Sequence, residues 1–294
     1  MLARQRGLLL LYRRHLRHLG REGRLLRRIV RYRGPQGVAT CAVEELPVAP
    51  LDEETLELPQ PYELLLPIEP PEVWCAGVTY ERSRDARIQE SQVKDVYALV
   101  YEADRPELFL KDACCRRTVG PGRPIRVRSD SCWNVPEPEV AVVLGENGAI
   151  VGLTIGNDVS SRSIEGENPL YLPQAKIYAG ACALGPALLV DGDWETPWTV
   201  AMRILDEEGG VLFQGETSTG RMRRSFSELV EWLLRDNPVP PGSALLTGTG
   251  LVPPDDFTLR PGHVVEIRVP GIGTLRNPVA GQNPRAAQGK ERKR

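Results

Sequence analysis

The stretch "VPEPEVAVVLGENGAIVGLTIGND", residues 135–158, combines an acidic start, a turn signal and two apolar runs. Glu137 and Glu139 come immediately before the β-branched run, and side chains two residues apart in a strand point to the same face. Two like charges this close repel each other or raise a pKa unless something neutralises them. The stretch therefore predicts a strand hairpin that brings negative charge to one end of a buried sheet.

The turn of this hairpin sets the pairing of its strands. Asn147-Gly148 is the strongest short signal for a two-residue type I′ turn. With those two residues as the loop, Glu137 lies opposite Asp158, and Glu139 lies opposite Gly156. Directly opposed residues have Cβ atoms about 5 Å apart. We therefore expect three carboxylates to converge on one patch, with a glycine where a side chain would crowd them.

Three carboxylates in one patch predict a metal site. Hard oxygen ligands with no histidine or cysteine nearby suit Mg²⁺ or Mn²⁺, and they leave coordination positions for water or substrate oxygens. We expect this divalent cation to neutralise Glu137, Glu139 and Asp158. The alternative is that the glutamates are solvated edge residues and the aspartate a turn residue. The agreement of all three positions under an independently chosen turn favours the metal.

Charge is strongly segregated along the chain of 294 residues. Residues 1–33 contain eleven Arg and one Glu, and the tail from Asn277 contains five Lys or Arg and one Glu, whereas residues 34–276 hold 21 basic and 37 acidic residues. An acidic body argues against nucleic-acid binding, which needs clustered cations. The longest apolar run of the basic start is too short for a membrane span or a signal peptide. Six scattered cysteines without CxxC spacing indicate reduced thiols, and we expect a cytoplasmic protein.

The pattern of apolar runs and turns predicts a β-rich α+β fold. From Val73 onward short apolar strands alternate with Gly/Pro turns, and two helices are expected at 88–103 and 225–235. The second helix opens with Ser225 and Glu228 in capping-box spacing. We expect four parts: a basic N-terminal extension at 1–27, a small region and linker at 28–69 with a hairpin around Gly34-Pro35, a main domain at 70–276, and a disordered basic tail at 277–294.

Several longer motifs carry a resemblance to a known family. They are "RPELFLK" (105–111), the acidic hairpin ending in "DVSSR" (158–162), "ENPLYLPQAKIYAG" (167–180) and "RDNPVPPGSALLTGTG" (235–250). Together they resemble the fumarylacetoacetate hydrolase superfamily over about residues 70–276, and are most similar to its 2-keto-3-deoxy-D-arabinonate dehydratase branch. The resemblance implies a mixed β-roll catalytic domain with a few helices, usually in a homo-oligomer. It also implies Mg²⁺ held by Glu137, Glu139 and Asp158.

The resemblance implies roles for three further residues. Lys176 matches a lysine that faces the bound substrate, where a cation can stabilise an oxyanion or, when desolvated, act as a base. Glu107 matches a glutamate proposed for acid–base work, and its alternative is a salt bridge with Arg105 or Lys111. Thr249 resembles a loop threonine that contacts a substrate carboxylate, and its alternative is a plain glycine turn.

One departure from the family pattern bears on the reaction. Hydrolytic and decarboxylating relatives carry a histidine after the segment that here reads "GVTYERSRDARIQE" (77–90), but this chain has no histidine between His18 and His263. Dehydration needs no base to activate an attacking water. The resemblance therefore implies a Mg²⁺-dependent dehydratase of a 2-keto-3-deoxy sugar acid, converting 2-keto-3-deoxy-D-arabinonate to 2,5-dioxopentanoate and water in pentose catabolism. The alternatives are an acylpyruvate-type C–C hydrolase or oxaloacetate decarboxylase, and a non-catalytic metal-binding homologue.

Overall fold

The computed structural model describes residues 27–81, 99–194 and 196–281. The predicted extension up to residue 26, residues 88–98 of the first predicted helix, and the tail beyond residue 281 lie outside this part. Residues 99–102 are helical, as expected for the end of the first helix. In the described residues, no helix is long and apolar enough to cross a membrane.

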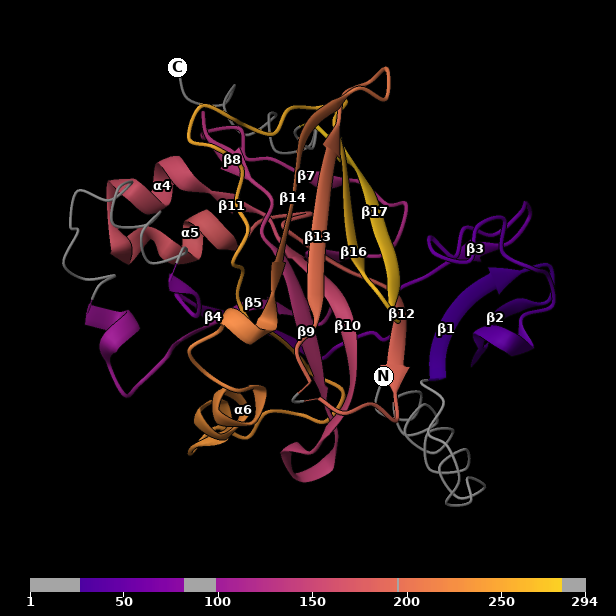
Figure 1. Cartoon of the computed structure of the whole chain (residues 1–294), viewed down its shortest axis with the longest axis horizontal. Helices are drawn as coiled ribbons and strands as arrows, with labels where there is room; N and C mark the ends of the chain where they lie inside the picture. The colour runs from indigo at the N-terminus through magenta and orange to yellow at the C-terminus, as the bar shows by residue number, and fades with distance from the viewer. Residues whose placement is uncertain (1–26, 82–98, 195, 282–294) are drawn as a thin grey trace, which may run out of the picture.

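A ten-stranded mixed sheet forms the larger layer (Figure 1). Its strands follow the order β2-β1-β12-β10-β9-β15-β4-β5, and β3 and β6 pair with β1 and β12. Their bounds are β1 Arg27–Gly34, β2 Gly37–Ala42, β3 Glu63–Leu64, β4 Glu72–Gly77, β5 Glu107–Ala113, β6 Thr118–Val119, β9 Pro138–Leu144, β10 Ile150–Asp158, β12 Cys182–Val190 and β15 Ala244–Leu246.

A five-stranded sheet of order β14-β13-β16-β17-β7 packs against the larger one, and a short pair, β8–β11, lies beside them. Alternate side chains of β9 and β10, such as Val142 and Ile155, meet Met202 and Ile267 of the smaller sheet in the main apolar core. The bounds are β7 Ile125–Arg126, β8 Asn134–Val135, β11 Ser160–Ser161, β13 Thr199–Leu205, β14 Val211–Ser218, β16 Val264–Val269 and β17 Gly273–Ala280. The predicted β-rich α+β class is confirmed.

Short helices close the ends of the sheets. They are α4 Arg162–Glu167, α5 Leu172–Lys176 and α6 Phe226–Leu234, with 3₁₀ turns η1 Val43–Glu45, η2 Glu146–Gly148, η3 Pro169–Tyr171 and η4 Thr219–Arg221. Helix α6 confirms the second predicted helix, and the Ser225 hydroxyl accepts a hydrogen bond from the N–H of Glu228 (3.1 Å). The Glu228 carboxylate pairs with Arg224.

The turn between β9 and β10 has the expected conformation but not the expected register. Asn147 and Gly148 both adopt positive φ, 58° and 73°, as a type I′ turn requires. Next to the turn, Leu144 pairs with Ile150, one residue away from the predicted pairing, and an irregularity between Ile150 and Gly152 removes the offset. Such bulges change the local twist of a hairpin. The predicted register therefore returns before the acidic end of the hairpin.

The ends of the main domain differ from the predicted boundaries. Gly34 pairs with Gly37, which confirms the hairpin around Gly34-Pro35, but β1 already starts at Arg27 and also pairs with β12. At the other end β17 continues to Ala280, and the buried Asn277 side chain donates to the carbonyl of Gly120 (2.9 Å). The prediction of disorder is wrong for residues 277–280, because these residues complete the smaller sheet.

Candidate metal and substrate site

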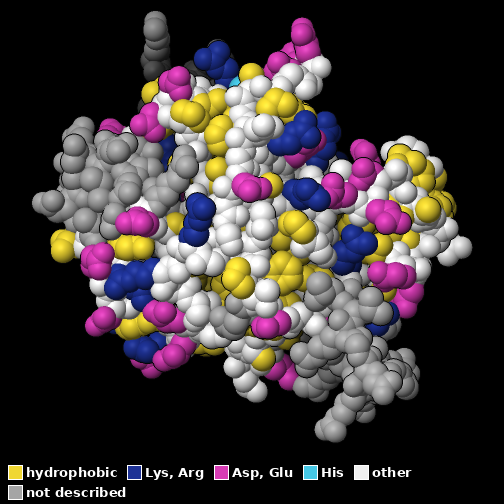
Figure 2. Space-filling model, viewed as in Figure 1, with side chains coloured by type: hydrophobic (Ala, Val, Ile, Leu, Met, Phe, Trp, Pro, Cys, Tyr) yellow, Lys and Arg dark blue, Asp and Glu magenta, His cyan; other side chains and the backbone are white. Residues whose placement is uncertain are grey.

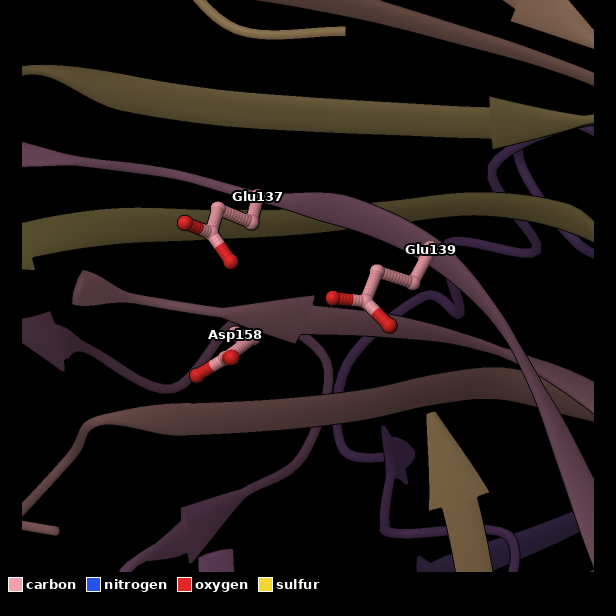
Figure 3. Close-up of side chains that lie close together, drawn as sticks. All are labelled: Glu137, Glu139 and Asp158. Atoms are coloured by element: carbon pink, nitrogen blue, oxygen red, sulfur yellow. The ribbon is translucent and has the colours of Figure 1, made fainter. Parts of the chain in front are cut away.

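The structure brings the three predicted carboxylates together. Glu139 pairs with Gly156, and the N–H of Asp158 donates to the carbonyl of Glu137 (3.0 Å), so the predicted register holds here. One carboxylate oxygen from each of Glu137, Glu139 and Asp158 lies within 4.8 Å of the others, and Figure 3 shows the side chains projecting from neighbouring strands. Their exposed fractions are 4%, 2% and 1%. These are therefore buried acids rather than solvated edge residues.

The triad lies on the face of the larger sheet that is turned away from the smaller sheet. On β9, Glu139 shares this face with Ala141 and Val143, which belong to a second apolar cluster with Cys75 and Leu246. This apolar surrounding removes water from the carboxylates. Burial, and then the charges of Asp158 and Glu137, raise the pKa of Glu139 well above its ordinary value.

The glycine opposite Glu139 has a different neighbour from the one expected. A Cβ on Gly156 would lie 2.8 Å from Cγ of Leu246, which is closer than carbon atoms pack. The atoms that a methyl group there would meet first are those of the Leu246 side chain. The missing side chain makes room for the apolar cluster beneath the site.

Three cations of the protein already neutralise part of the triad. Lys176 Nζ donates to Glu137 (2.7 Å), Asp158 (2.8 Å) and the hydroxyl of Ser160 (2.5 Å). Lys111 pairs with the other oxygen of Asp158. Arg162 pairs with Glu137 at 2.9 Å. The triad is therefore neutralised in part by cations of the protein, in addition to the divalent metal that the sequence predicts.

Glu139 has a different environment from its two partners. Its carboxylate accepts a hydrogen bond from the backbone N–H of Gly248 (2.5 Å), and among the described residues it makes no ion pair. Glu165 adds a fourth buried carboxylate, which pairs with Arg162 (3.2 Å) and Lys176 (3.3 Å). Among the described residues, four carboxylates thus face three cations. A buried set of oxygen donors with one excess negative charge fits a hard divalent cation such as Mg²⁺.

Local sequence explains how Arg162 and Lys176 reach the triad. The chain leaves β10 through β11, and the Ser161 hydroxyl caps α4 by accepting from the N–H of Ile164 (3.3 Å). The helix therefore begins at Arg162, directly beside the end of β10. Helix α5 ends at Lys176, whose ammonium lies 5.7 Å from the centre of the Phe109 ring on β5. Lys176 is fully buried, and its ammonium contacts two of the three carboxylates of the triad.

Glu107 lies on the strand that faces Lys176. It begins β5, pairs with Gly77, and its carboxylate covers the position that a Cβ of Gly77 would fill. Phe109 follows two residues later on the same face of the strand and carries the ring next to Lys176. The alternative partner Lys111 pairs with Asp158 instead. Glu107 therefore lies on the same strand as Phe109 and Lys111, which both approach the triad or its lysine.

The loop after β15 holds the site through its backbone. Gly248 adopts a φ of +97°, which favours glycine, and its N–H binds Glu139. The hydroxyl of the buried Thr249 exchanges hydrogen bonds with the backbone of Leu251 (3.0 and 3.2 Å). The predicted loop thus lies against the triad, and its first glycine makes the contact that the structure describes.

Sequence reasoning missed three charged members of the site. Arg162 and Glu165 follow Asp158 by four and seven residues. The sequence feature that indicates them is Ser161, which can cap a helix that begins directly after the returning strand. The sequence predicts Lys111 only as an alternative salt-bridge partner of Glu107. The feature that indicates its role is its position two residues after Phe109 in the strand "ELFLKDA".

The chain belongs to the fumarylacetoacetate hydrolase family. The family described as fumarylacetoacetate (FAA) hydrolase C-terminal matches residues 72–280, which include every site residue named above. The resemblance read from the sequence motifs is confirmed.

Two relatives and one solved structure are similar to this chain over most of its length. The chain is 51% identical over 215 residues to a probable 2-keto-3-deoxyxylonate dehydratase of Haloferax volcanii, covering 73% of this chain and 74% of the relative. It is 48% identical over 218 residues to the 2-dehydro-3-deoxy-D-arabinonate dehydratase of Saccharolobus solfataricus, covering 72% of this chain and 73% of the relative. A solved 2-keto-3-deoxy-D-arabinonate dehydratase complexed with magnesium and 2,5-dioxopentanoate shares 37% identity and a TM-score of 0.75, covering 87% of this chain and 99% of that one.

Proposed function

We propose that this protein is a Mg²⁺-dependent dehydratase that converts 2-keto-3-deoxy-D-arabinonate, or a close pentonate, to 2,5-dioxopentanoate and water. The observation that carries the proposal is the buried triad with Lys176, set within a region about half identical to two relatives named as dehydratases. Both relatives' names describe a five-carbon 2-keto acid with a methylene at C3. The absence of a histidine between His18 and His263 favours dehydration over hydrolysis.

Glu137, Glu139 and Asp158 are the residues that would hold the cation. When bound, Mg²⁺ supplies a Lewis acid that polarises the 2-keto group and makes the C3 proton acidic. Glu139 contributes most directly, because its charge has no cationic partner among the described residues. Lys111, Lys176 and Arg162 keep Glu137 and Asp158 in place for the same task.

Glu107 and Lys176 have different roles in the proposed reaction. The ammonium of Lys176 uses its three N–H donors on Glu137, Asp158 and Ser160, so it acts as a hydrogen-bond donor to oxygen in this arrangement. We therefore assign Glu107 as the base that takes the C3 proton and Lys176 as the group that stabilises negative oxygen. The C4–O bond breaks and the hydroxyl leaves as water after protonation. Two further proton transfers convert the C5 alcohol of the product into the aldehyde.

We also propose a contact for the substrate carboxylate, a cellular location and an oligomeric state. Thr249 would contact the substrate carboxylate after exchanging its bonds to Leu251. We also propose that the protein works in the cytoplasm, in pentose catabolism, and as a homo-oligomer. The cytoplasmic location is supported by the six scattered cysteines, which have no CxxC spacing.

The decisive experiment is incubation with a panel of 2-keto acids and Mg²⁺, followed by mass spectrometry. We expect 2-keto-3-deoxy-D-arabinonate to give a product lighter by one water. Acylpyruvates and oxaloacetate should react at least about 100-fold more slowly, which corresponds to nearly 3 kcal/mol in barrier. Release of pyruvate at a comparable kcat/KM would replace the proposal with a hydrolase or decarboxylase. Metal-dependent stability without turnover on any member would indicate the non-catalytic homologue.

A further inference from the structure

The segment 103–106 leads into β5 without being part of a helix or a strand. It lies between the helical residues 99–102 and the start of β5 at Glu107. Glu107 pairs with Gly77, and this is the last pair of the β4–β5 ladder. The ladder therefore fixes Glu107 from one side only. Its position on the other side depends on what holds the segment 103–106.

Arg224 holds this segment by its backbone. The guanidinium donates to the carbonyl of Ala103 and to the carbonyl of Asp104, the second at 2.9 Å. The Arg224 side chain is 8% exposed, and its charge is paired with Glu228. A buried charge is costly unless it is paired and hydrogen-bonded, so these contacts keep Arg224 inside. The planar fork of N–H donors suits two neighbouring carbonyls better than a lysine ammonium does.

The anchor that Arg224 provides is part of the core. Arg224 comes directly before Ser225, the residue that caps helix α6. One face of α6 is buried in the main apolar core through Phe226, Leu229, Val230 and Leu233. The contacts of Arg224 therefore join the segment 103–106 to a fixed element of the fold.

Helix α6 makes a second contact with the same segment. The guanidinium of Arg105 lies 4.7 Å from the centre of the Trp232 ring, which is within the range of a cation–π interaction. The helix and its preceding arginine thus hold three consecutive residues of the segment. Pro106 comes next, and its ring fixes φ. Few free backbone dihedrals remain between this anchor and Glu107.

We propose that Arg224 is a positioning residue for the reaction, which holds the entry to β5 against α6 and so determines where the Glu107 carboxylate lies. The inference rests on the proposed function, because that function gives Glu107 the role of the base. A base must lie within hydrogen-bond reach of the proton that it takes. Removal of Arg224 should therefore slow proton removal and leave the binding of the divalent cation unaffected.

The test combines Arg224→Met with Glu107→Gln in a kinetic cycle on 2-keto-3-deoxy-D-arabinonate. A misplacement of about 1 Å can cost about 10²-fold in rate, so we expect Arg224→Met to lower kcat by at least about tenfold and to change KM by less than about threefold. In the Glu107→Gln background it should lower kcat by less than about twofold, because the base is already absent. The affinity for Mg²⁺, measured by calorimetry, should not change.

Glu228→Gln is the matched control for this cycle. It removes the charge partner of Arg224 and leaves both carbonyl contacts in place. We therefore expect it to change kcat by less than about twofold, because the effect belongs to the contacts that position the segment. A loss of kcat in Glu228→Gln as large as that in Arg224→Met overturns the proposal.

Hydrogen exchange measured by mass spectrometry gives a readout that does not depend on activity. Peptides that cover residues 103–108 should exchange at least about tenfold faster in Arg224→Met than in the unmodified protein, since local opening becomes easier there. Peptides from β9 should exchange as before. Unchanged exchange of residues 103–108 overturns the proposal.

The cycle separates positioning from general support of the fold. A residue that only supports the fold would lower kcat by the same factor with and without Glu107, so equal losses in the two backgrounds overturn the proposal. If Arg224→Met does not fold, Arg224→Lys keeps the charge and carries the same comparisons. Failure of the unmodified protein to dehydrate any 2-keto acid would remove the proposed function and with it the role of Glu107. Faster exchange would still show that Arg224 fixes the start of β5.

Discussion

The two sheets of this protein carry the same kinds of charged residue in opposite surroundings. On the larger sheet, Glu137 and Asp158 and their lysine partners are between 0% and 5% exposed. On the smaller sheet, Glu266 of β16 pairs with Arg276 of β17 at 3.1 Å, and the arginine is 48% exposed. Figure 2 shows charges of both signs scattered over the face that carries β13 and β14.

The exposure of an ion pair determines how much the loss of one partner destabilises the protein. Exposed pairs contribute little because water and salt screen them and because two long side chains lose freedom. Buried pairs repay their desolvation only when every partner is present, so the loss of one partner leaves a costly charge behind. A protein that buries four carboxylates at one end of an apolar cluster gains no stability that an apolar core would not supply. The arrangement makes sense only as a site.

The largest expected effect is the loss of activity on removing a metal ligand. Glu139→Gln and Asp158→Asn should each lower kcat/KM by more than about 10³-fold, because the Lewis acid is worth several kcal/mol to the transition state. The two variants should differ in stability measured in EDTA. Glu139→Gln relieves like-charge repulsion and should not lower the thermal midpoint, whereas Asp158→Asn removes the carboxylate that pairs with the buried Lys111 and should lower it.

Metal removal provides the control for these two variants. Treatment of the unmodified protein with EDTA should abolish activity, and Mg²⁺ or Mn²⁺ should restore it. Full activity of the metal-free protein would contradict the assignment of the triad as a metal site.

A smaller loss of activity is expected at the two groups that act on the substrate. Glu107→Gln removes the proposed base and should lower kcat by about 10²–10⁴-fold, the usual worth of general acid–base help. Lys176→Met removes the donor to negative oxygen and should lower kcat by about 10²–10³-fold, the usual worth of one such donor. Mg²⁺ binding measured by calorimetry should persist in both, since neither residue belongs to the triad. The variant Glu107→Asp keeps the carboxylate and should retain part of the activity. Loss of Mg²⁺ binding in Glu107→Gln would show that this glutamate belongs to the metal site.

Substitution of Gly156, which lies under the site, is expected to lower the free energy of unfolding without removing a site residue. Gly156→Ala places a Cβ against Leu246, and overpacking of a filled core costs about 1–3 kcal/mol. Urea unfolding of the Mg²⁺-free protein measures this loss. The control is Gly281→Ala, whose Cβ would meet only Pro261 at an ordinary 3.6 Å. An unfolding free energy equal to that of the unmodified protein would show that Leu246 moves aside without cost.

The hairpin shows how far sequence reasoning reaches in this protein. Periodicity and one turn signal were sufficient to place Glu137 opposite Asp158, although the pairing next to the turn is shifted by one residue. The prediction held because an irregularity between Ile150 and Gly152 shifts the pairing back by one residue before the strands reach the site. No local sequence rule predicts such a compensating shift. Lys111 was harder to predict, because it reaches Asp158 only through the order of strands in the sheet. Arg162 reaches Glu137 from the start of the helix that follows β10.

The smallest expected effect belongs to the exposed pair on the smaller sheet. Glu266→Gln removes the partner of Arg276 but leaves both side chains in contact with water, so the unfolding free energy should fall by less than about 1 kcal/mol. The coupling measured with Arg276→Gln in a double-mutant cycle should be about 0.2–1 kcal/mol and should vanish near 1 M salt, where the Debye length is about 3 Å. Activity should not change. A coupling above about 2 kcal/mol that survives high salt would contradict this prediction, because the exposed pair would then behave like the buried pairs around Asp158.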